Sequence, residues 1–339
     1  MVSVVVAFTV IAIVPDLSNY SQFLGSKDAP VGVFQMPTVE PKAIPREQLV
    51  QYSLKMINSD RTNFSLPAVQ LSSNEAAQVH AEDVFSTKQI SHWMTNGEKP
   101  YMTYTRYGGS GNVHQNVAIA GFTAEQYQKC NAVLSTCEVI DPISALRELE
   151  HQMMYDDTVC CDNGHRENIL DPHHTHVSIG IAYDKYYLAF VENFEDSYGL
   201  QTSVSGGSVY VVGHLTSGIL RQVEVHYDPL PTPAIYEQNK KLLSYSAGKL
   251  LAAVAPPLPF GYQYRQPVGY KVISADEWNV NNNFVNVAFR LGPILSLEGT
   301  TAAAQAGVYT LYAVIEDGQG RLFDVTSYSI FVEGARSSG

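Results

Sequence analysis

The sequence predicts an α+β domain followed by an all-β, immunoglobulin-like sandwich. Apolar residues recur at helical spacing over residues 47–60 and 142–155, whereas paired strand-like runs follow only after residue 176. Helices that precede strands, without a repeating strand–helix–strand order, are typical of an α+β sandwich. Beyond about Tyr198, aromatic and β-branched segments alternate with Gly, Pro and Asn turns, a pattern typical of a β-sandwich.

The chain divides into four segments, and its 339 residues leave room for about two domains. The segments are an apolar head (residues 1–14), an extended proline-containing linker (15–45), the α+β domain (46–196) and the β-sandwich (200–335). The head is too short for a comfortable transmembrane helix, which needs about 20 residues. It fits a signal-peptide core or an anchor, although no Lys or Arg precedes it, and it also fits a buried or donated β-strand.

Three helices and a strand hairpin are expected in the α+β domain. Besides the two helices above, Ser72 and Glu75 form a capping-box pattern that opens a helix to about Thr87. His80 lies on the apolar face of that helix, where a hydrogen-bonded core histidine is favoured over a ligand. Residues 177–183 and 186–191 are expected as paired strands joined at Asp184-Lys185.

The second domain is expected to consist of strands joined by tight turns. Residues 317–320, Asp-Gly-Gln-Gly, are a hairpin signal before the last strand. Residues 228–233 and 256–259 are proline-rich and are expected to be rigid spacers or edge covers. This half of the chain shows no catalytic constellation. The expected strands cover residues 209–215, 221–227, 270–274, 285–291, 308–316 and 322–332.

The formal net charge of −12 argues against some classes of partner. Non-specific nucleic-acid binding needs clustered Lys and Arg to neutralise phosphates, and an acidic chain opposes it. The same charge opposes electrostatic docking to anionic membranes. The charge therefore predicts that nucleic acid is not a partner.

The four cysteines, Cys130, Cys137, Cys160 and Cys161, indicate an oxidising compartment, because an even and clustered set suggests disulfides. Adjacent cysteines bridge only with strain, since their Cα atoms lie about 3.8 Å apart and a disulfide prefers about 5.5 Å. We therefore expect two bridges from Cys130 and Cys137 to Cys160 and Cys161, with the pairing open. Sequons at Asn19 and Asn63 are compatible with export and are candidate glycosylation sites.

Histidines at three places could form a metal site. His92, His114-Gln115 and His165 would supply two neutral imidazoles and an oxygen, which suits Zn²⁺ with an open position for water. Their separation in the sequence neither supports nor excludes this arrangement. The alternative is that histidines merely gather near loops, as the nearby His173, His174 and His176 also do.

Residues 46–196 resemble the CAP family of cysteine-rich secretory, antigen-5 and pathogenesis-related-1 proteins, in its bacterial and archaeal SCP-like form. The motifs on which this resemblance rests occur in the same order as in the family. Glu75–Val84 resembles the second helix of the family, and Ile90-Ser91-His92 resembles its first histidine segment. His114–Ala118 resembles the Gly-Glu-Asn-Ile-Ala motif, Gly164–Pro172 resembles the second histidine motif, and Val177–Ala182 resembles the strand that follows it. With the cysteine pair and an appended β domain, the chain looks most like archaeal members.

The resemblance implies an α-β-α sandwich whose central cleft carries two His and two Glu. His92 and His165 match the histidines, but Gln115 stands where the first Glu belongs. An amide is neutral and serves poorly as a base or as a cation ligand. The second Glu falls near residues 154–155, where no carboxylate matches, although Glu150, Asp156 and Asp157 are nearby. Zn²⁺ binding by His92 and His165 is still expected to be feasible, and acid–base hydrolysis is less favoured.

Three functions are therefore weighed. The favoured one is an extracellular or surface-anchored, non-catalytic protein that binds a small apolar ligand, a metal, or both in the His-lined cleft. The second is a zinc-dependent hydrolase or peptidase, which needs one carboxylate, such as Glu150, Asp156, Asp157 or Glu167, facing both histidines. The third is a structural surface subunit that self-assembles through residues 1–20 by strand addition.

Overall fold

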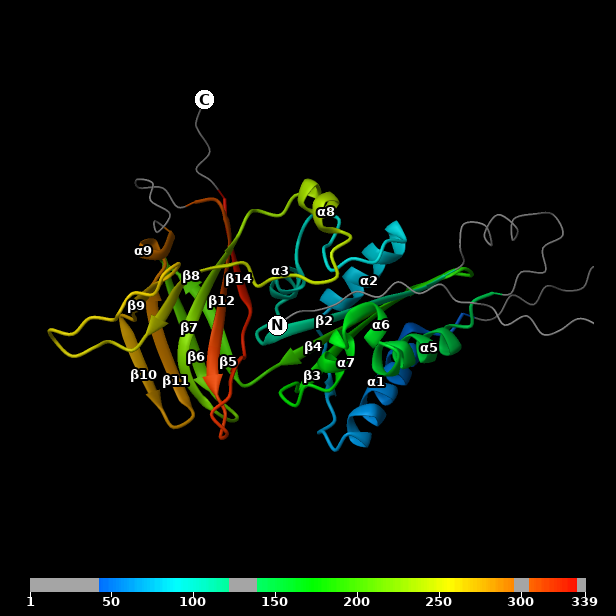
Figure 1. Ribbon diagram of the computed structural model, residues 1–339, viewed down its shortest axis with the longest axis horizontal. Coiled ribbons are helices and arrows are strands. Elements are labelled where there is room, and N and C mark those ends of the chain that lie inside the picture. The colour runs from blue at the N-terminus through cyan, green and yellow to red at the C-terminus, as the bar shows by residue number, and fades with distance from the viewer. Residues whose placement is uncertain (1–42, 122–138, 296–304, 334–339) are drawn as a thin grey trace, which may run out of the picture.

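The computed structural model describes residues 43–121, 139–295 and 305–333. They form two domains, an α-β-α sandwich and a β-sandwich, which occupy opposite ends of the molecule (Figure 1). Within these ranges, no helix has both the length and the apolar content required to cross a bilayer. The predictions for the apolar head, the linker to residue 42, the Asn19 sequon, Cys130 and Cys137 lie outside the described residues.

The first domain is built on a four-stranded sheet in the order β1-β3-β4-β2. β2 and β3 pair antiparallel with β4, whereas β1 pairs parallel with β3. Asp184 turns β3 into β4, because its side-chain oxygen accepts hydrogen bonds from the N–H groups of Tyr186 and Tyr187 (2.7 and 2.8 Å). The strands are β1 (Gln70–Leu71), β2 (Asn112–Gly121), β3 (His176–Tyr183) and β4 (Tyr187–Asp196).

Helices cover both faces of this sheet and confirm the expected α-β-α sandwich. α1 and α5 pack on one face in a core that includes Leu146 and Phe190, and α2 packs on the other face through Ala77 and Val191. Glycine is required at position 180, because a Cβ there would lie 1.9 Å from the carbonyl oxygen of Ala77. The helices are α1 (Arg46–Asn63), α2 (Ala76–Thr87), α3 (Pro100–Arg106), α5 (Pro142–Tyr155), α6 (Thr158–Cys161) and α7 (Gly164–Ile169).

The start of α2 differs from the prediction. Neither Ser72 nor Glu75 caps the helix by a capping box, because Asn74 forms the local turn: its Oδ1 accepts a hydrogen bond from the N–H of Ala76 (2.9 Å). Ser72 Oγ in turn accepts from the N–H of Asn74 (3.2 Å). A short amide side chain close to a helix start competes for the same backbone donors, and the capping-box prediction is therefore wrong.

The second domain is a β-sandwich of two sheets that pack face to face. One sheet has the order β10-β11-β6-β5 and the other β13-β12-β7-β8-β9, with β14 also paired to β12. Val211 and Val287 from the first sheet share a core with Val225 and Leu311 from the second. The elements are β5 (Leu200–Ser205), β6 (Ser208–His214), β7 (Ile219–Asp228), β8 (Lys249–Ala255), β9 (Lys271–Ser274), β10 (Glu277–Asn281), β11 (Phe284–Arg290), α9 (Gly292–Leu295), β12 (Gly307–Glu316), β13 (Leu322–Asp324) and β14 (Tyr328–Val332).

The strands β1, β2, β5, β8 and β10 were not predicted. In β8 and β10 the amino-acid composition explains the miss. β8 is rich in Ala and Leu, residues that favour helices as readily as strands. β10 is a sheet-edge strand with three polar residues among its five. In the first domain, α3 was not predicted either, although Pro100 in its first turn is a favourable start for a helix.

The two domains pack directly against each other along α3 and β14. Thr105 Oγ1 donates a hydrogen bond to the carbonyl of Ser327 (3.1 Å) and accepts one from the N–H of Ser329 (3.0 Å). The guanidinium of Arg106 lies 3.8 Å from the ring centroid of Phe331. Backbone and side-chain contacts therefore fix the second domain on the first.

Residues 229–248, called the arm below, leave β7 and cross to the first domain before they return to β8 (Figure 1). The arm contains α8 (Pro233–Asn239), which begins after Thr232. Thr232 presses on Gly97, because a Cβ at Gly97 would lie 2.2 Å from the carbonyl oxygen of Thr232, and the φ of Gly97 is +91°. Glycine is therefore required at position 97, where the arm contacts the first domain.

Candidate functional site

His92 lies in a buried polar network on the α2 face of the first-domain sheet. Gln115 on β2 accepts a hydrogen bond from His92 Nδ1 through Oε1 (3.0 Å). Its Nε2 donates to His80 Nδ1 (3.2 Å) and to Asn193 Oδ1 on β4 (3.0 Å). His80 donates from Nε2 to the carbonyl of Ser91 (2.8 Å). His80, His92 and Gln115 are fully buried, so the amide connects two imidazoles out of contact with solvent.

This network determines the tautomers of both histidines. Burial lowers the pKa of His80, which keeps the ring neutral with its lone pair on Nδ1. Gln115 offers His92 only an acceptor, so the His92 proton lies on Nδ1 and the lone pair on Nε2. His80 is thus a hydrogen-bonded core residue, as expected, while His92 keeps the tautomer that suits an Nε2 ligand.

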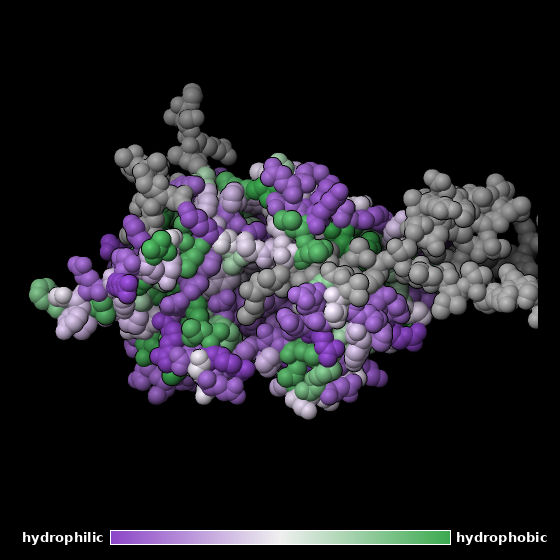
Figure 2. All heavy atoms as spheres, viewed as in Figure 1, coloured by the Kyte–Doolittle hydropathy of each residue, from purple (hydrophilic) through white to green (hydrophobic). Residues whose placement is uncertain are grey.

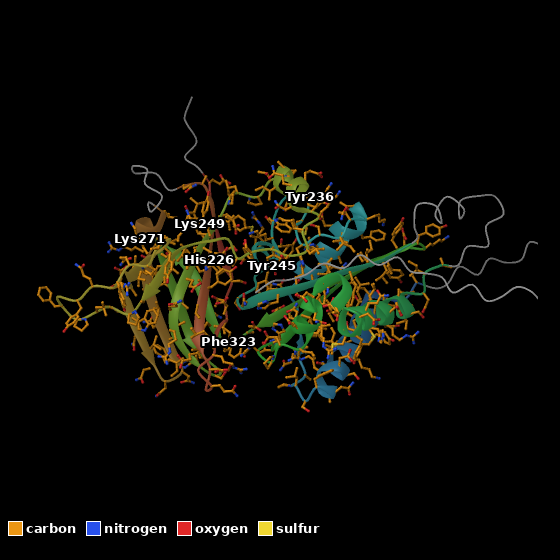
Figure 3. All side chains as sticks on the ribbon, viewed as in Figure 1. His226, Tyr236, Tyr245, Lys249, Lys271 and Phe323 are labelled. Carbon is orange, nitrogen blue, oxygen red and sulfur yellow. The ribbon has the colours of Figure 1, made fainter. Side chains whose placement is uncertain are left out.

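An aromatic ring from the arm covers His92. The Tyr245 ring packs edge-on against it, with centroids 5.1 Å apart and an interplanar angle of 65°. Trp93 and Tyr101 also pack around the Tyr245 ring, with ring centroids 6.5 and 6.1 Å from that of Tyr245. The labelled Tyr245 in Figure 3 lies where the two domains meet. The histidine predicted to line an open cleft is therefore closed over by the second domain.

Charged and polar contacts hold the arm in this position. Lys99 Nζ donates to Asp228 Oδ1 (2.7 Å) and to the carbonyl of Ser246 (2.9 Å). Tyr101 donates to Asp228 Oδ2 and, at 3.3 Å, to the same Ser246 carbonyl. Lys99 and Asp228 are 8% and 7% exposed, so this ion pair is largely desolvated and depends on its geometry. The residue after Tyr245 is thus tied to the first domain.

His165 belongs to a different network. Its Nδ1 donates to Asp157 Oδ1 (2.6 Å), and Asp157 Oδ2 accepts from the N–H groups of His165 and Arg166 (2.8 and 3.2 Å). Asn116 Nδ2 contacts the carbonyl of His165 at 3.4 Å. Within the described part of the chain, His165 Nε2 is buried and makes no hydrogen bond. A carboxylate on Nδ1 fixes this ring as it fixes metal-binding histidines.

The two histidines are attached to opposite faces of the sheet. Gln115 and Asn116 are consecutive in β2, so their side chains point to opposite faces; Gln115 holds His92, and Asn116 contacts His165. The hydrogen bonds of His165 include none to His92 in the described ranges. The contacts therefore place His92 and His165 in separate environments, and their sharing of a cation stays a prediction.

Glu150 on α5 and Glu192 on β4 form a buried acid pair that the sequence did not reveal. Glu150 is 2% exposed and Glu192 fully buried. Burial raises the pKa of Glu192 to about 7, and burial together with the neighbouring Glu192 raises the pKa of Glu150. Asn116 Nδ2 donates to Glu192 Oε2 (3.1 Å). Burial and the closeness of two acids therefore favour the protonated form of at least one of these carboxyl groups.

The other acidic residues predicted for the cleft differ in burial and in their contacts. Asp157 is fully engaged with His165, whereas the side chain of Asp156 is 62% exposed beside His151 and does not belong to a cleft. Glu167 is also exposed. Among the described carboxylates, Asp157 is the candidate that binds one of the two histidines, His165. The zinc-hydrolase alternative stays a prediction.

Three side chains in the cysteine region lie close enough together to be considered as a cation site. Asp157, Cys161 and His165 bring ligand atoms within 4.8 Å of one another, but these atoms are already engaged. Cys161 is buried and disulfide-bonded, and Asp157 binds His165 through both carboxylate oxygens. The triad therefore does not fit a resident cation. The disulfide pairing stays a prediction, since the side chains of Cys130, Cys137 and Cys160 lie outside the described residues.

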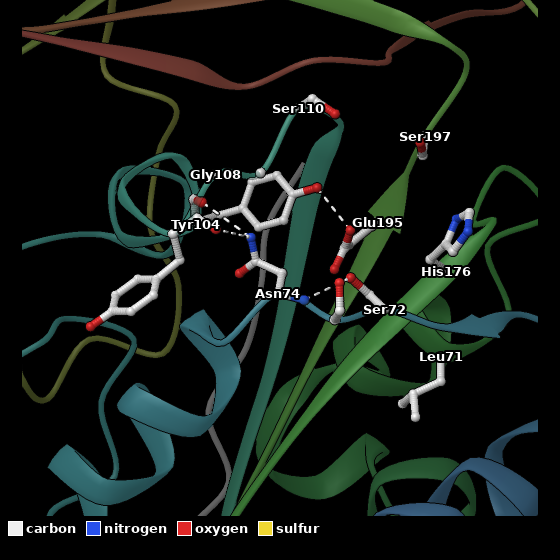
Figure 4. A pocket seen from close by; sticks show the side chains of 12 residues that line it. Leu71, Ser72, Asn74, Tyr104, Gly108, Ser110, His176, Glu195 and Ser197 are labelled. Atoms are coloured by element: carbon white, nitrogen blue, oxygen red, sulfur yellow. Dashed lines mark hydrogen bonds between the residues drawn. The ribbon is translucent and has the colours of Figure 1, made fainter.

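A polar pocket of about 360 Å³ opens elsewhere, between α3 and the end of β4 (Figure 4). Tyr104 donates to Glu195 Oε2 (2.8 Å), and Asn74 Nδ2 donates to the carbonyls of Tyr104 and Tyr107 (3.4 and 3.1 Å). Burial raises the pKa of Glu195. None of the residues predicted for the cleft lines this pocket, and it therefore does not represent the His-lined site.

A second histidine pair at the domain junction was missed. Asp196 Oδ1 accepts from His174 Nδ1 (2.6 Å), and its Oδ2 lies 3.3 Å from His114 Nε2. The two histidines hold the pKa of Asp196 well below its usual range against the opposing effect of burial, while Asp196 raises the pKa of His114 despite burial. His114 was noted only as the neighbour of Gln115; no local pattern marks Asp196 as its partner.

One of three comparisons with known proteins identifies the family of the first domain. The model of the CAP family, the cysteine-rich secretory protein family, matches residues 54–194. A solved structure of an extracellular protein containing a SCP domain, from Bacillus anthracis, is 17% identical with a TM-score of 0.32, and the match covers 44% of this chain and 41% of that chain. A comparison with curated proteins gave no match.

The first domain is therefore a four-stranded sheet with helices on both faces. It belongs to the CAP family, as its histidine motifs and the family match together show. The β-sandwich that follows it lies outside the matched residues.

Proposed function

We propose that this is an extracellular, non-catalytic binding protein whose CAP domain holds a small apolar ligand beside His92. The observation that carries the proposal is the Tyr245 ring, which lies 5.1 Å from the His92 ring between their centroids. An aromatic ring thus already packs against His92. A ligand of similar chemistry would take its place when the arm moves away.

The residues that pack around Tyr245 favour an apolar ligand. Tyr245 packs against a cluster that includes Tyr101, Met102 and Val308, and Trp93 is 4% exposed. Such a lining gains free energy from apolar and aromatic surface and offers few groups for an ionic ligand. The Nε2 atom of His92 would provide the polar contact that orients the ligand.

The same site argues against hydrolysis. Gln115, which occupies the expected Glu position, uses both ends of its amide for His92, His80 and Asn193. A neutral amide in that position cannot take a proton from water. Binding therefore agrees with the described residues better than catalysis does.

Features of the sequence and of Cys161 support the proposal that the protein is exported. Cys161 is disulfide-bonded, and disulfides persist mainly in oxidising compartments. The apolar residues 1–14 fit an export signal or an anchor. Asn63 is exposed at the end of α1, as a glycosylation acceptor must be.

The test uses the two tryptophans of the chain, Trp93 and Trp278. With Trp278→Phe as the background, Trp93 becomes the single tryptophan donor for energy transfer to an apolar fluorophore such as anilinonaphthalenesulfonate. Tyr245→Ala should open the site and strengthen Trp93-detected binding about tenfold, because removal of the ring eliminates the competing apolar group.

Tyr245→Phe is the matched control, since it keeps the ring and removes only the hydroxyl. It should bind the probe like the parent protein. Equal binding by the Ala and Phe variants, or binding that leaves Trp93 emission unchanged, would refute a ligand site beneath Tyr245.

A further inference from the structure

A loop at the far end of the second domain exposes large apolar side chains. Residues 256–270, called the projecting loop below, join β8 to β9 and extend away from the body of the sandwich (Figure 1). The exposed fractions of Phe260, Tyr262 and Val268 are 106%, 73% and 102%. Figure 2 shows apolar residues at the tip of this projection. Such a concentration of exposed apolar residues is typical of a binding surface.

Hydrogen bonds and prolines hold the loop in its extended position. The Gln266 side chain donates to the carbonyl of Val272 (3.0 Å) and accepts from the N–H of the same residue (2.9 Å). Tyr264 donates to the carbonyl of Pro256 (2.5 Å). Four prolines, Pro256, Pro257, Pro259 and Pro267, further restrict the backbone. The apolar tip is therefore presented by an ordered support, which lowers the entropic cost of binding.

The charge around this loop is opposite to that of the whole chain. The chain has a net charge of −12, yet residues 249–275 contain Lys249, Arg265 and Lys271 and no Asp or Glu. All three basic residues are exposed. Lys249 and Lys271 begin neighbouring strands and lie at the same end of the sandwich (Figure 3). The acid that follows in sequence, Asp276, is paired with Arg290 at 3.2 Å.

We propose that the projecting loop docks this protein on an anionic phospholipid bilayer. Phe260, Tyr262 and Val268 would enter the interfacial region of the lipid, where aromatic and apolar side chains gain free energy. Arg265 and Lys271 would contact head-group phosphates. The negative net charge of the chain does not prevent this contact, because physiological salt screens charges beyond about 8 Å.

A bilayer fits these observations better than a protein pocket does. The exposed apolar side chains belong to the projecting loop, and Lys249 and Lys271 lie where the loop returns to the sandwich (Figure 3). Apolar and basic groups on one projection suit the apolar interior and the anionic surface of a membrane. The proposal goes beyond the cleft function and does not depend on it, because the loop and Tyr245 lie at different ends of the second domain (Figure 3).

Vesicle flotation of the full chain tests the proposal. The parent protein should float with phosphatidylcholine vesicles that contain phosphatidylglycerol, and less with pure phosphatidylcholine. Phe260→Ser with Val268→Ser should lower partitioning about tenfold or more, because two apolar anchors are lost. Arg265→Gln with Lys271→Gln should lower it about 25-fold and remove the preference for phosphatidylglycerol, at about fivefold for each charge.

Leu322→Ser is the matched control, because Leu322 is a 59% exposed apolar residue on a different hairpin; it should float like the parent. The variants change exposed residues, and unchanged melting temperatures would show that each is folded. If the parent protein fails to float, or if the loop variants float as it does, the proposal is overturned. It is also overturned if the loop variants change only the oligomeric state in sedimentation, which would identify a second copy as the partner.

Discussion

Gln115 Oε1 accepts a hydrogen bond from Nδ1 of His92 across 3.0 Å. The amide has the two functions that a carboxylate could not combine here, since it accepts from one histidine and donates to another. Its NH₂ group satisfies His80 Nδ1 and Asn193 Oδ1, which are both acceptors. Gln115 departs from the family pattern, but its hydrogen-bond partners are those that an amide can satisfy.

Gln115→Glu should destabilise the protein. A carboxylate there would face two acceptors in a fully buried site, so the free energy of unfolding should fall by about 1–3 kcal/mol. Urea denaturation at neutral pH measures it. Gln201→Glu on β5, an exposed position, is the matched control, and equal losses for both variants would show that the buried network is not selective for an amide.

Asp157→Asn should weaken the support of His165. The substitution replaces one of the oxygens that accept from His165 and Arg166 by an amide donor, and a loss of about 2–3 kcal/mol is expected. Denaturation of Asp156→Asn provides the comparison, because that neighbouring side chain is 62% exposed and its change should stay within about 0.5 kcal/mol. Similar values for the two variants would contradict the assignment.

The Glu150–Glu192 pair predicts that stability falls as the pH rises. Burial raises the pKa values of both carboxyl groups above their usual range, that of Glu192 to about 7. The folded protein therefore binds protons more tightly than the unfolded chain does, and this stabilisation is lost between about pH 4.5 and 7 and above.

Glu192→Gln should reduce this pH dependence, because the amide needs no proton and can donate to Glu150. Melting temperatures at pH 5 and pH 8 measure the slope in each variant. Glu167→Gln, at an exposed position, should retain the parent slope; an unchanged slope in Glu192→Gln would exclude the pair as the titrating group.

Lys99 and Asp228 should show strong coupling across the domain interface. Lys99→Met leaves a buried carboxylate with only Tyr101, and a single substitution of either partner should cost about 3 kcal/mol or more. The double variant Lys99→Met with Asp228→Asn should cost less than the sum of the two single changes. Additive losses in a denaturation cycle would show that the ion pair does not fix the arm.

Local sequence patterns predicted some features well because the physical cause of each is local. Residues 142–155 form α5 at the predicted bounds, since a helical apolar stripe and a first-turn proline act within a few residues. The Ser72–Glu75 pattern failed for an equally local reason, because Asn74 offered the backbone a competing partner. His92 and His165 were found from motifs, but their partners were not.

The sequence by itself determined the two-domain order, most elements and the CAP histidine motifs, because periodicity and short motifs record interactions between near neighbours. Only the tertiary structure decided that Tyr245 covers His92, that Glu192 joins Glu150, and that Gln115 and Asn116 direct the two histidines to different faces. These contacts join residues from separate helices, strands and domains. Their energies depend on how the sheets and the arm pack, and no local pattern in the chain encodes that packing.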